Sequence, residues 1–204
     1  MKIYSNIQLL FAAAAAVASV AFVLPASAAS DKEQAAAAFI ENLAEQTIAI
    51  LNKDLTDDDL EEAMTKLLGD NVAIERIGRV VAGQYLRRMS PAQRVAYDEM
   101  YREWVIATVT SRFKGFADIG WVLKQTFSRK KDVIVRTLIT DPASNETVNC
   151  DWRVREIKGR PQILDVAVAG LSMAATQKSE FGAILSRDGI DGLLAQLQIQ
   201  IEKR

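Results

Sequence analysis

The chain has 204 residues, among them 25 Lys and Arg and 26 Asp and Glu, so its formal net charge is −1. This near-neutral balance argues against nucleic acid as a general electrostatic partner. The chain has no histidine, which excludes Ser–His and Cys–His catalysis and removes the commonest metal ligand. Its one cysteine, Cys150, permits no intramolecular disulfide.

The N-terminal segment predicts a secretory signal peptide covering residues 1–28. Lys2 is basic, Leu9–Leu24 is an apolar run, and Pro25 precedes the small-x-small sequence Ala26-Ser27-Ala28. An uncleaved membrane anchor is the less favoured alternative, because the run is shorter than the roughly 20 residues that cross a bilayer. We therefore expect cleavage after Ala28 and a single exported domain over 29–204.

The first half of this domain predicts helices. The capping sequences Ser30-x-x-Glu33 and Ser90-Pro91-Ala92-Gln93 indicate two helix starts, and Thr56-x-x-Asp59 indicates a third. A further helical segment is predicted over 72–81, and two more at the C-terminus around 181–185 and 193–201, because apolar residues recur there at helical spacing.

Between these helices the period of the apolar residues changes to two. The segments 119–127, 133–140, 147–156 and 162–169 alternate and are rich in β-branched and aromatic residues, which predicts strands. Polar, turn-prone connectors favour antiparallel hairpins. We therefore predict an α+β fold, in which a twisted four-stranded antiparallel sheet with one apolar face packs against helices.

Alternation along the strands assigns their faces. Cys150, Trp152 and Val154 are expected on one face of their strand, and Leu164, Val166 and Val168 share a face of the last strand.

The acidic residues give no recognised catalytic or metal site. Asp57-Asp58-Asp59 is interpreted as a helix cap with acids at the positive end of the helix dipole. Asp188–Gly192 resembles a calcium loop only superficially and predicts a turn. Asp165 is a lone carboxylate within a strand, which is weak support for catalysis. No catalytic residue, metal or cofactor is predicted.

Two basic runs, Arg87-Arg88 and Arg129-Lys130-Lys131, are interpreted as solvated surface, the second at a hairpin tip. The alternative for each run is a contact with phosphate head groups or with an acidic partner.

Two stretches carry a resemblance to a known family. Residues 165–172 read DVAVAGLS and are followed by QKSEF at 177–181, while IGRVVAGQY at 77–85 is followed by SPAQR at 90–94. These resemble the signatures of the MlaC-type (toluene-tolerance) periplasmic phospholipid-binding proteins. The likeness covers the mature chain in its order of elements, although Ala82 stands where the family often has Leu.

The resemblance implies a sheet of the NTF2-like or cystatin-like kind with extra helices, enclosing an apolar pocket for acyl chains. It implies a periplasmic carrier that shuttles phospholipid between an outer-membrane lipoprotein complex and an inner-membrane ABC transporter complex; a hopanoid-associated branch of the family remains an alternative. By strand parity and helix position, we predict the pocket lining to be Trp104, Thr108, Trp121, Leu138, Trp152, Val154, Val166, Val168, Leu171 and Met173.

Two functions of other classes stay open. The first is an enzyme on a similar sheet that uses a pocket carboxylate, either Asp118 or Asp165. The second is an adaptor that binds only proteins, which would present a large apolar patch outside and enclose no cavity.

Overall fold

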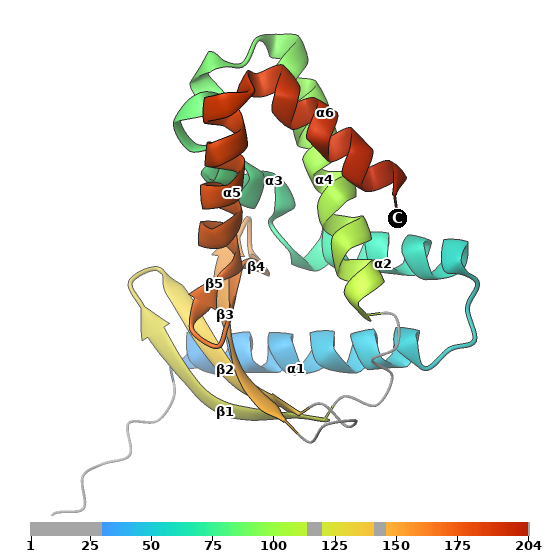
Figure 1. Ribbon diagram of the computed structural model, residues 1–204. Coiled ribbons are helices and arrows are strands. Elements are labelled where there is room, and N and C mark those ends of the chain that lie inside the picture. The colour runs from blue at the N-terminus through green and yellow to red at the C-terminus, as the bar shows by residue number, and fades with distance from the viewer. Residues whose placement is uncertain (1–29, 114–119, 141–145, 204) are drawn as a thin grey trace, which may run out of the picture.

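The computed structural model describes residues 30–113, 120–140 and 146–203 (Figure 1). The predicted signal peptide lies outside these residues. The described part contains helices α1 (Asp31–Leu51), α2 (Asp57–Asn71), α3 (Ile74–Ala82), η1 (Gly83–Arg88, a 3-10 helix), α4 (Pro91–Phe113), α5 (Met173–Arg187) and α6 (Gly189–Glu202). Its strands are β1 (Gly120–Arg129), β2 (Asp132–Thr140), β3 (Thr147–Ile157), β4 (Arg160–Val168) and β5 (Leu171–Ser172). No helix among these residues has the length and apolar character needed to cross a bilayer.

The strands form one antiparallel sheet in the order β1-β2-β3-β4-β5. The predicted α+β class and the four long strands are confirmed, but the predicted number of strands is wrong. The fifth strand arises because Ala169 and Gly170, both with positive φ, turn the chain back so that Leu171 pairs with Val168. A strand of two residues is too short to show alternation, which is why the sequence pattern missed it.

The helix starts predicted from capping sequences are confirmed by hydrogen bonds. Ser30 and Glu33 form a reciprocal capping box at α1. The Gln93 backbone N–H donates to Ser90 Oγ at 3.2 Å, and the Ser90 N–H donates to Gln93 Oε1 at 3.0 Å. At α2, the Thr56 hydroxyl accepts from the Asp59 N–H, and the three acids fill the first turn, as the capping interpretation predicts. In the described part of the chain no group of acids or cysteine could hold a metal ion.

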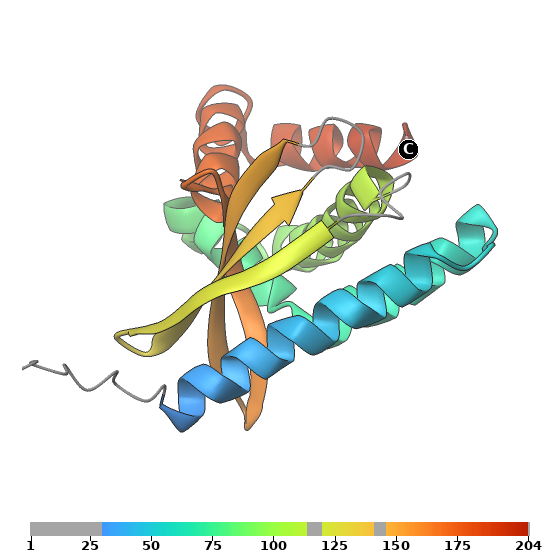
Figure 2. The ribbon, with the colours of Figure 1, turned by 90° about the horizontal axis from the view of Figure 1, so that it is seen from below.

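One apolar cluster joins the sheet to α1, which lies across one face of the sheet (Figure 2). We call it the sheet cluster. Its buried members are Ala36, Ile40, Val133, Val135, Val154 and Ile163. A tether fixes the start of α1: the Glu33 carboxylate accepts from both the backbone N–H and the hydroxyl of Ser128, at 2.8 and 2.6 Å, and these hydrogen bonds lower the pKa of Glu33.

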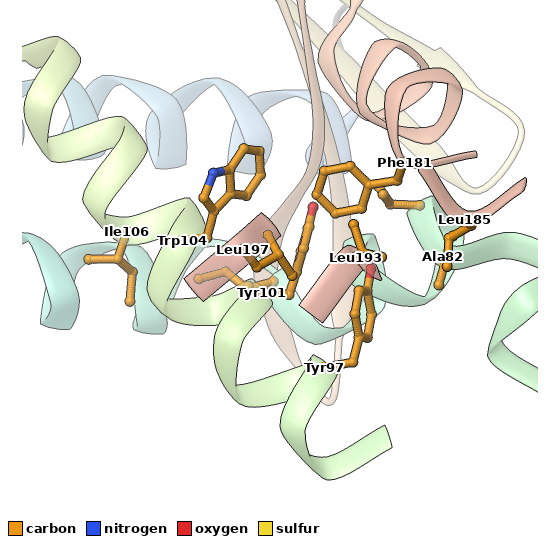
Figure 3. Packing of buried hydrophobic residues seen from close by; sticks show 11 residues of the cluster. Ala82, Tyr97, Tyr101, Trp104, Ile106, Phe181, Leu185, Leu193 and Leu197 are labelled. Atoms are coloured by element: carbon orange, nitrogen blue, oxygen red, sulfur yellow. The ribbon is translucent and has the colours of Figure 1, made fainter. Parts of the chain in front are cut away.

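A second apolar cluster, the helical cluster, gathers α3, α4, α5 and α6 around aromatic rings (Figure 3). Tyr97 and Tyr101 stack at 5.6 Å between ring centroids, and Phe181 meets Tyr101 edge-on at 6.1 Å. The Tyr97 hydroxyl donates to the Gly78 carbonyl oxygen at 2.8 Å. Burial raises the pKa of both tyrosines, so both phenols stay protonated donors.

Candidate functional site

The strand register defines two chemically different faces of the sheet. Cross-strand pairs on the face that carries α1, here called the inner face, are Val133 with Val154, Val135 with Trp152, Thr137 with Cys150, and Ile139 with Val148. On the opposite, outer face Arg136 forms a bidentate ion pair with Asp151, at 2.6 and 2.7 Å. The inner face is therefore largely apolar, as predicted, whereas the outer face carries apolar side chains as well, among them the buried Ile134.

The two ends of the inner face are buried to different extents. Near the β1–β2 turn, Val133, Val135 and Val154 are buried against α1. Towards the other end of the strands, apolar side chains of the inner face are only partly buried; they are Trp121, Ile139, Val148 and Val168. The inner face thus carries apolar surface beyond what α1 covers, and we call these four residues the open end.

A polar contact fixes the largest side chain of the inner face. The Trp152 indole N–H donates to Thr137 Oγ1 at 2.9 Å, and Thr137 is buried. Cys150 is buried beside it, and burial raises the pKa of its thiol. The thiol is therefore neutral at ordinary pH, which lowers its reactivity as a nucleophile.

Of the predicted lining residues, Trp152, Trp121, Val166 and Val168 share the inner face. Val154 shares it too, but lies buried within the sheet cluster.

The residues predicted on helices lie elsewhere. Trp104 is buried in the helical cluster, where its indole N–H donates to Gln200 Oε1 of α6 at 2.6 Å. Thr108 lies one turn further along α4, and its buried Oγ1 has no hydrogen-bond partner. Met173 is the partly buried first residue of α5.

Two predicted lining residues are not brought to this surface. Leu138 pairs with Val122 and Asn149, which places it on the outer face, opposite Trp152. The prediction that Leu138 lines the pocket was made without knowledge of the strand register, and this register shows that it is wrong. Leu171 of β5 is 67% exposed.

Sequence reasoning missed other inner-face residues. Leu123 stands two residues from Trp121 and Val148 four residues from Trp152, so strand parity could have found both; Ile139 lies directly opposite Trp121. Ile163 could not be found in that way, because an irregularity in the register between Arg153 and Val154 brings it opposite Val154.

Asp165, one of the two carboxylates that an enzyme could use as a base, has a structural role. The Asp165 carboxylate accepts from the Ser172 hydroxyl at 2.5 Å and from the Ala174 N–H at 3.1 Å. The Ser172 hydroxyl in turn accepts from the Ala175 N–H, which caps α5. Asp165 therefore joins β4 to the start of α5. Asp118, the other candidate base, lies outside the described residues.

A pocket of about 670 Å³ lies between α3 and the turn that joins β3 to β4. Its lining is mostly charged and includes none of the residues predicted to hold acyl chains; the lining residues are Ala73, Glu75, Arg76, Arg79, Ile157, Lys158, Arg160 and Gln162. This basic pocket is distinct from the inner face and was not predicted.

The arrangement defines an α+β protein in which helices cover one face of an antiparallel sheet. A solved structure with the same fold is the phospholipid-binding protein from Ralstonia solanacearum in complex with a phospholipid. The two match with a TM-score of 0.69 and 20% sequence identity, over 82% of this chain and 97% of that one.

The family comparison is more specific than the fold. The model of the MlaC protein family matches residues 41–199, and this chain belongs to the MlaC family. The resemblance read from the two sequence signatures is thereby confirmed.

Proposed function

We propose that this protein is a periplasmic lipid carrier that holds the acyl chains of a phospholipid against the inner face of its sheet. The observation that carries the proposal is the open end of that face, where Trp121, Ile139, Val148 and Val168 are only partly buried. Membership of the MlaC family, and a structural neighbour solved with a phospholipid, support the same class of ligand.

The energetics suit a carrier rather than an enzyme. Burial of each methylene group contributes about 0.8 kcal/mol, so acyl chains bind apolar surface without specific polar contacts. Binding and release need no general base and no nucleophile, and the absence of histidine and the neutral thiol of Cys150 are compatible with that.

The proposal includes the route as well as the ligand. The carrier would receive phospholipid from one membrane and deliver it to the other, with an outer-membrane lipoprotein complex and an inner-membrane ABC transporter complex as partners. Among the ten predicted lining residues, we retain Trp121, Trp152, Val166 and Val168 as the wall formed by the sheet. Thr108 of α4 and Met173 of α5 remain candidates from the helices, whereas Trp104 is buried in the helical cluster.

The experiment is lipid extraction from the purified protein, followed by mass spectrometry. We expect a stoichiometric phospholipid in the wild type. Val168→Trp, which adds a large side chain at the open end, should lower lipid occupancy severalfold. Val122→Trp is the matched control, because Val122 lies on the outer face and is 53% exposed.

Three results would each count against the proposal or refine it. Wild-type protein that is consistently empty would contradict lipid binding, and equal occupancy in both variants would contradict the site. A hopanoid-type lipid in place of phospholipid would keep the site and assign the chain to the hopanoid-associated branch.

A further inference from the structure

The basic pocket is built from two rigid elements that lie far apart in the sequence. Arg76 and Arg79 stand on successive turns of α3, while Lys158 and Arg160 belong to the β3–β4 hairpin. Lys158 and Gly159 have φ values of 51° and 76°, so the hairpin closes in a tight two-residue turn. The cations are therefore presented on regular structure and not on a long loop.

A backbone contact fixes the floor of the pocket. The Ala73 N–H donates to the Ile163 carbonyl oxygen at 3.0 Å, and Val72 forms a parallel bridge with Ile163. These contacts join the start of α3 to β4, and Figure 1 shows the two elements side by side. The two elements that carry the cations are thus joined directly through their backbones.

The pocket carries uncompensated positive charge. None of Arg76, Arg79, Lys158 and Arg160 forms an ion pair with any residue of 30–113, 120–140 or 146–203. The one acid in the lining, Glu75, is already paired with Arg102 of α4 at 3.0 Å. Other arginines of the described residues do form ion pairs with carboxylates: Arg136 pairs with Asp151, and Arg155 pairs with Asp132.

Like charges held around one concavity repel each other, and an anion bound between them relieves that repulsion. Guanidinium groups present paired N–H donors whose geometry matches the oxygens of phosphate. A volume of about 670 Å³ exceeds the space that one phosphate group occupies, so the pocket has room for the group together with the molecule that carries it.

We propose that the basic pocket is a second ligand site, separate from the acyl-chain site, that binds a phosphate-bearing ligand through Arg76, Arg79, Lys158 and Arg160. Two sources have this chemistry: the head group of an anionic phospholipid in a bilayer surface, and a free phosphorylated solute. For a carrier, the first source would orient the protein on the membrane while the acyl-chain site stays available.

The test compares two triple variants of equal charge. Arg76→Gln/Arg79→Gln/Arg160→Gln removes three cations from the pocket. Lys53→Gln/Lys66→Gln/Lys124→Gln is the matched control, because it removes three exposed cations that lie outside the pocket lining and outside the two basic runs. All six side chains are exposed, so both variants should melt close to the wild type.

Two probes separate the sources. Inorganic pyrophosphate is titrated by calorimetry, and phosphatidylcholine vesicles with and without phosphatidic acid are used in a cosedimentation assay. We expect the pocket variant to lose about tenfold or more in affinity for at least one probe, and the control variant to lose much less. Loss with the vesicles alone assigns the site to a bilayer head group, and loss with pyrophosphate alone assigns it to a free solute.

Equal losses in the two variants would overturn the proposal, because unspecific attraction to net charge would then explain the binding. Stronger competition by an acidic peptide than by pyrophosphate would also overturn it and mark a protein-docking site. The lipid extracted from the pocket variant should match that of the wild type, so failure here is distinguishable from failure of the acyl-chain proposal.

Discussion

Gly78 allows α3 and α4 to approach closely, and we expect Gly78→Ala to destabilise the protein. A Cβ at this position would lie 2.7 Å from Tyr101 Cδ1 and 3.0 Å from Cε1, well inside ordinary carbon–carbon contact. The ring cannot move aside easily, because it stacks on Tyr97, meets Phe181 edge-on and donates its hydroxyl to Gln177 Oε1 at 2.8 Å.

The magnitude follows from two opposing terms. Overpacking of a well-packed core costs about 1–3 kcal/mol. Replacing a helical glycine with alanine gains about 1 kcal/mol, because the unfolded chain loses conformational freedom. Gly182 of α5 supplies the control, since a Cβ there would have no atom within 4 Å. The Gly182→Ala variant should therefore gain the helix term alone and become more stable.

The quantity to measure is the difference between the two variants, because the helix term is common to both. Urea unfolding with linear extrapolation should place Gly78→Ala below Gly182→Ala by about 1–3 kcal/mol with similar m-values. In the double variant Gly78→Ala/Tyr101→Leu, loss of the ring should remove most of the penalty of the added methyl group. Equal stabilisation by both alanines would refute the close approach of the helices.

Three further predictions each concern one hydrogen-bonding side chain. Tyr97→Phe removes the hydroxyl that donates to the Gly78 carbonyl oxygen and should lower the free energy of unfolding by about 0.5–1.5 kcal/mol, measured by urea unfolding. Ser172→Ala removes the cap of α5 and should cost about 1 kcal/mol, whereas Ser179→Ala on the exposed side of the same helix should change stability by less than about 0.5 kcal/mol. The Arg136 guanidinium, chiefly through its hydrogen bond, holds the pKa of Asp151 below its usual range, so this carboxylate stabilises the fold above its unfolded pKa of about 3.9 and ceases to do so as the pH falls through its folded pKa. Asp151→Asn should therefore cost up to about 1 kcal/mol at neutral pH and progressively less in acid, as followed by unfolding at a series of pH values.

The features that the sequence predicted well depend on contacts between near neighbours. The caps at Ser30, Thr56 and Ser90 each join residues three apart, so the pattern contains both partners. The four long strands and their hairpin turns were likewise placed within a few residues, because alternation and turn chemistry are local.

The features that it missed depend on how distant segments meet. The side of Leu138 and the inward position of Ile163 follow from register, which pairing across strands sets. The basic pocket joins residues about eighty positions apart, and neither Arg76 with Arg79 nor Lys158 with Arg160 is unusual in its own segment. A local pattern therefore has no means of showing that the four cations surround one concavity.

The signature at 165–172 has a mainly structural meaning. Asp165 and Ser172 join β4 to α5 by hydrogen bonds, and Gly170, with a φ of 82°, completes the turn between them. The alternate residues, Val166 and Val168, remain on the inner face, where both are partly buried. A residue that only needs to be apolar there specifies its ligand weakly, because acyl chains bind any apolar surface of suitable shape.

The signature therefore identifies the fold more sharply than it identifies the lipid. Substitution of Asp165 or Ser172 should lower stability and leave the identity of the extracted lipid unchanged. Selection of a lipid head group requires polar groups outside the signature. On α4, the Oγ1 atoms of Thr108 and Thr110 are buried without a hydrogen-bond partner, so they are candidates for such groups.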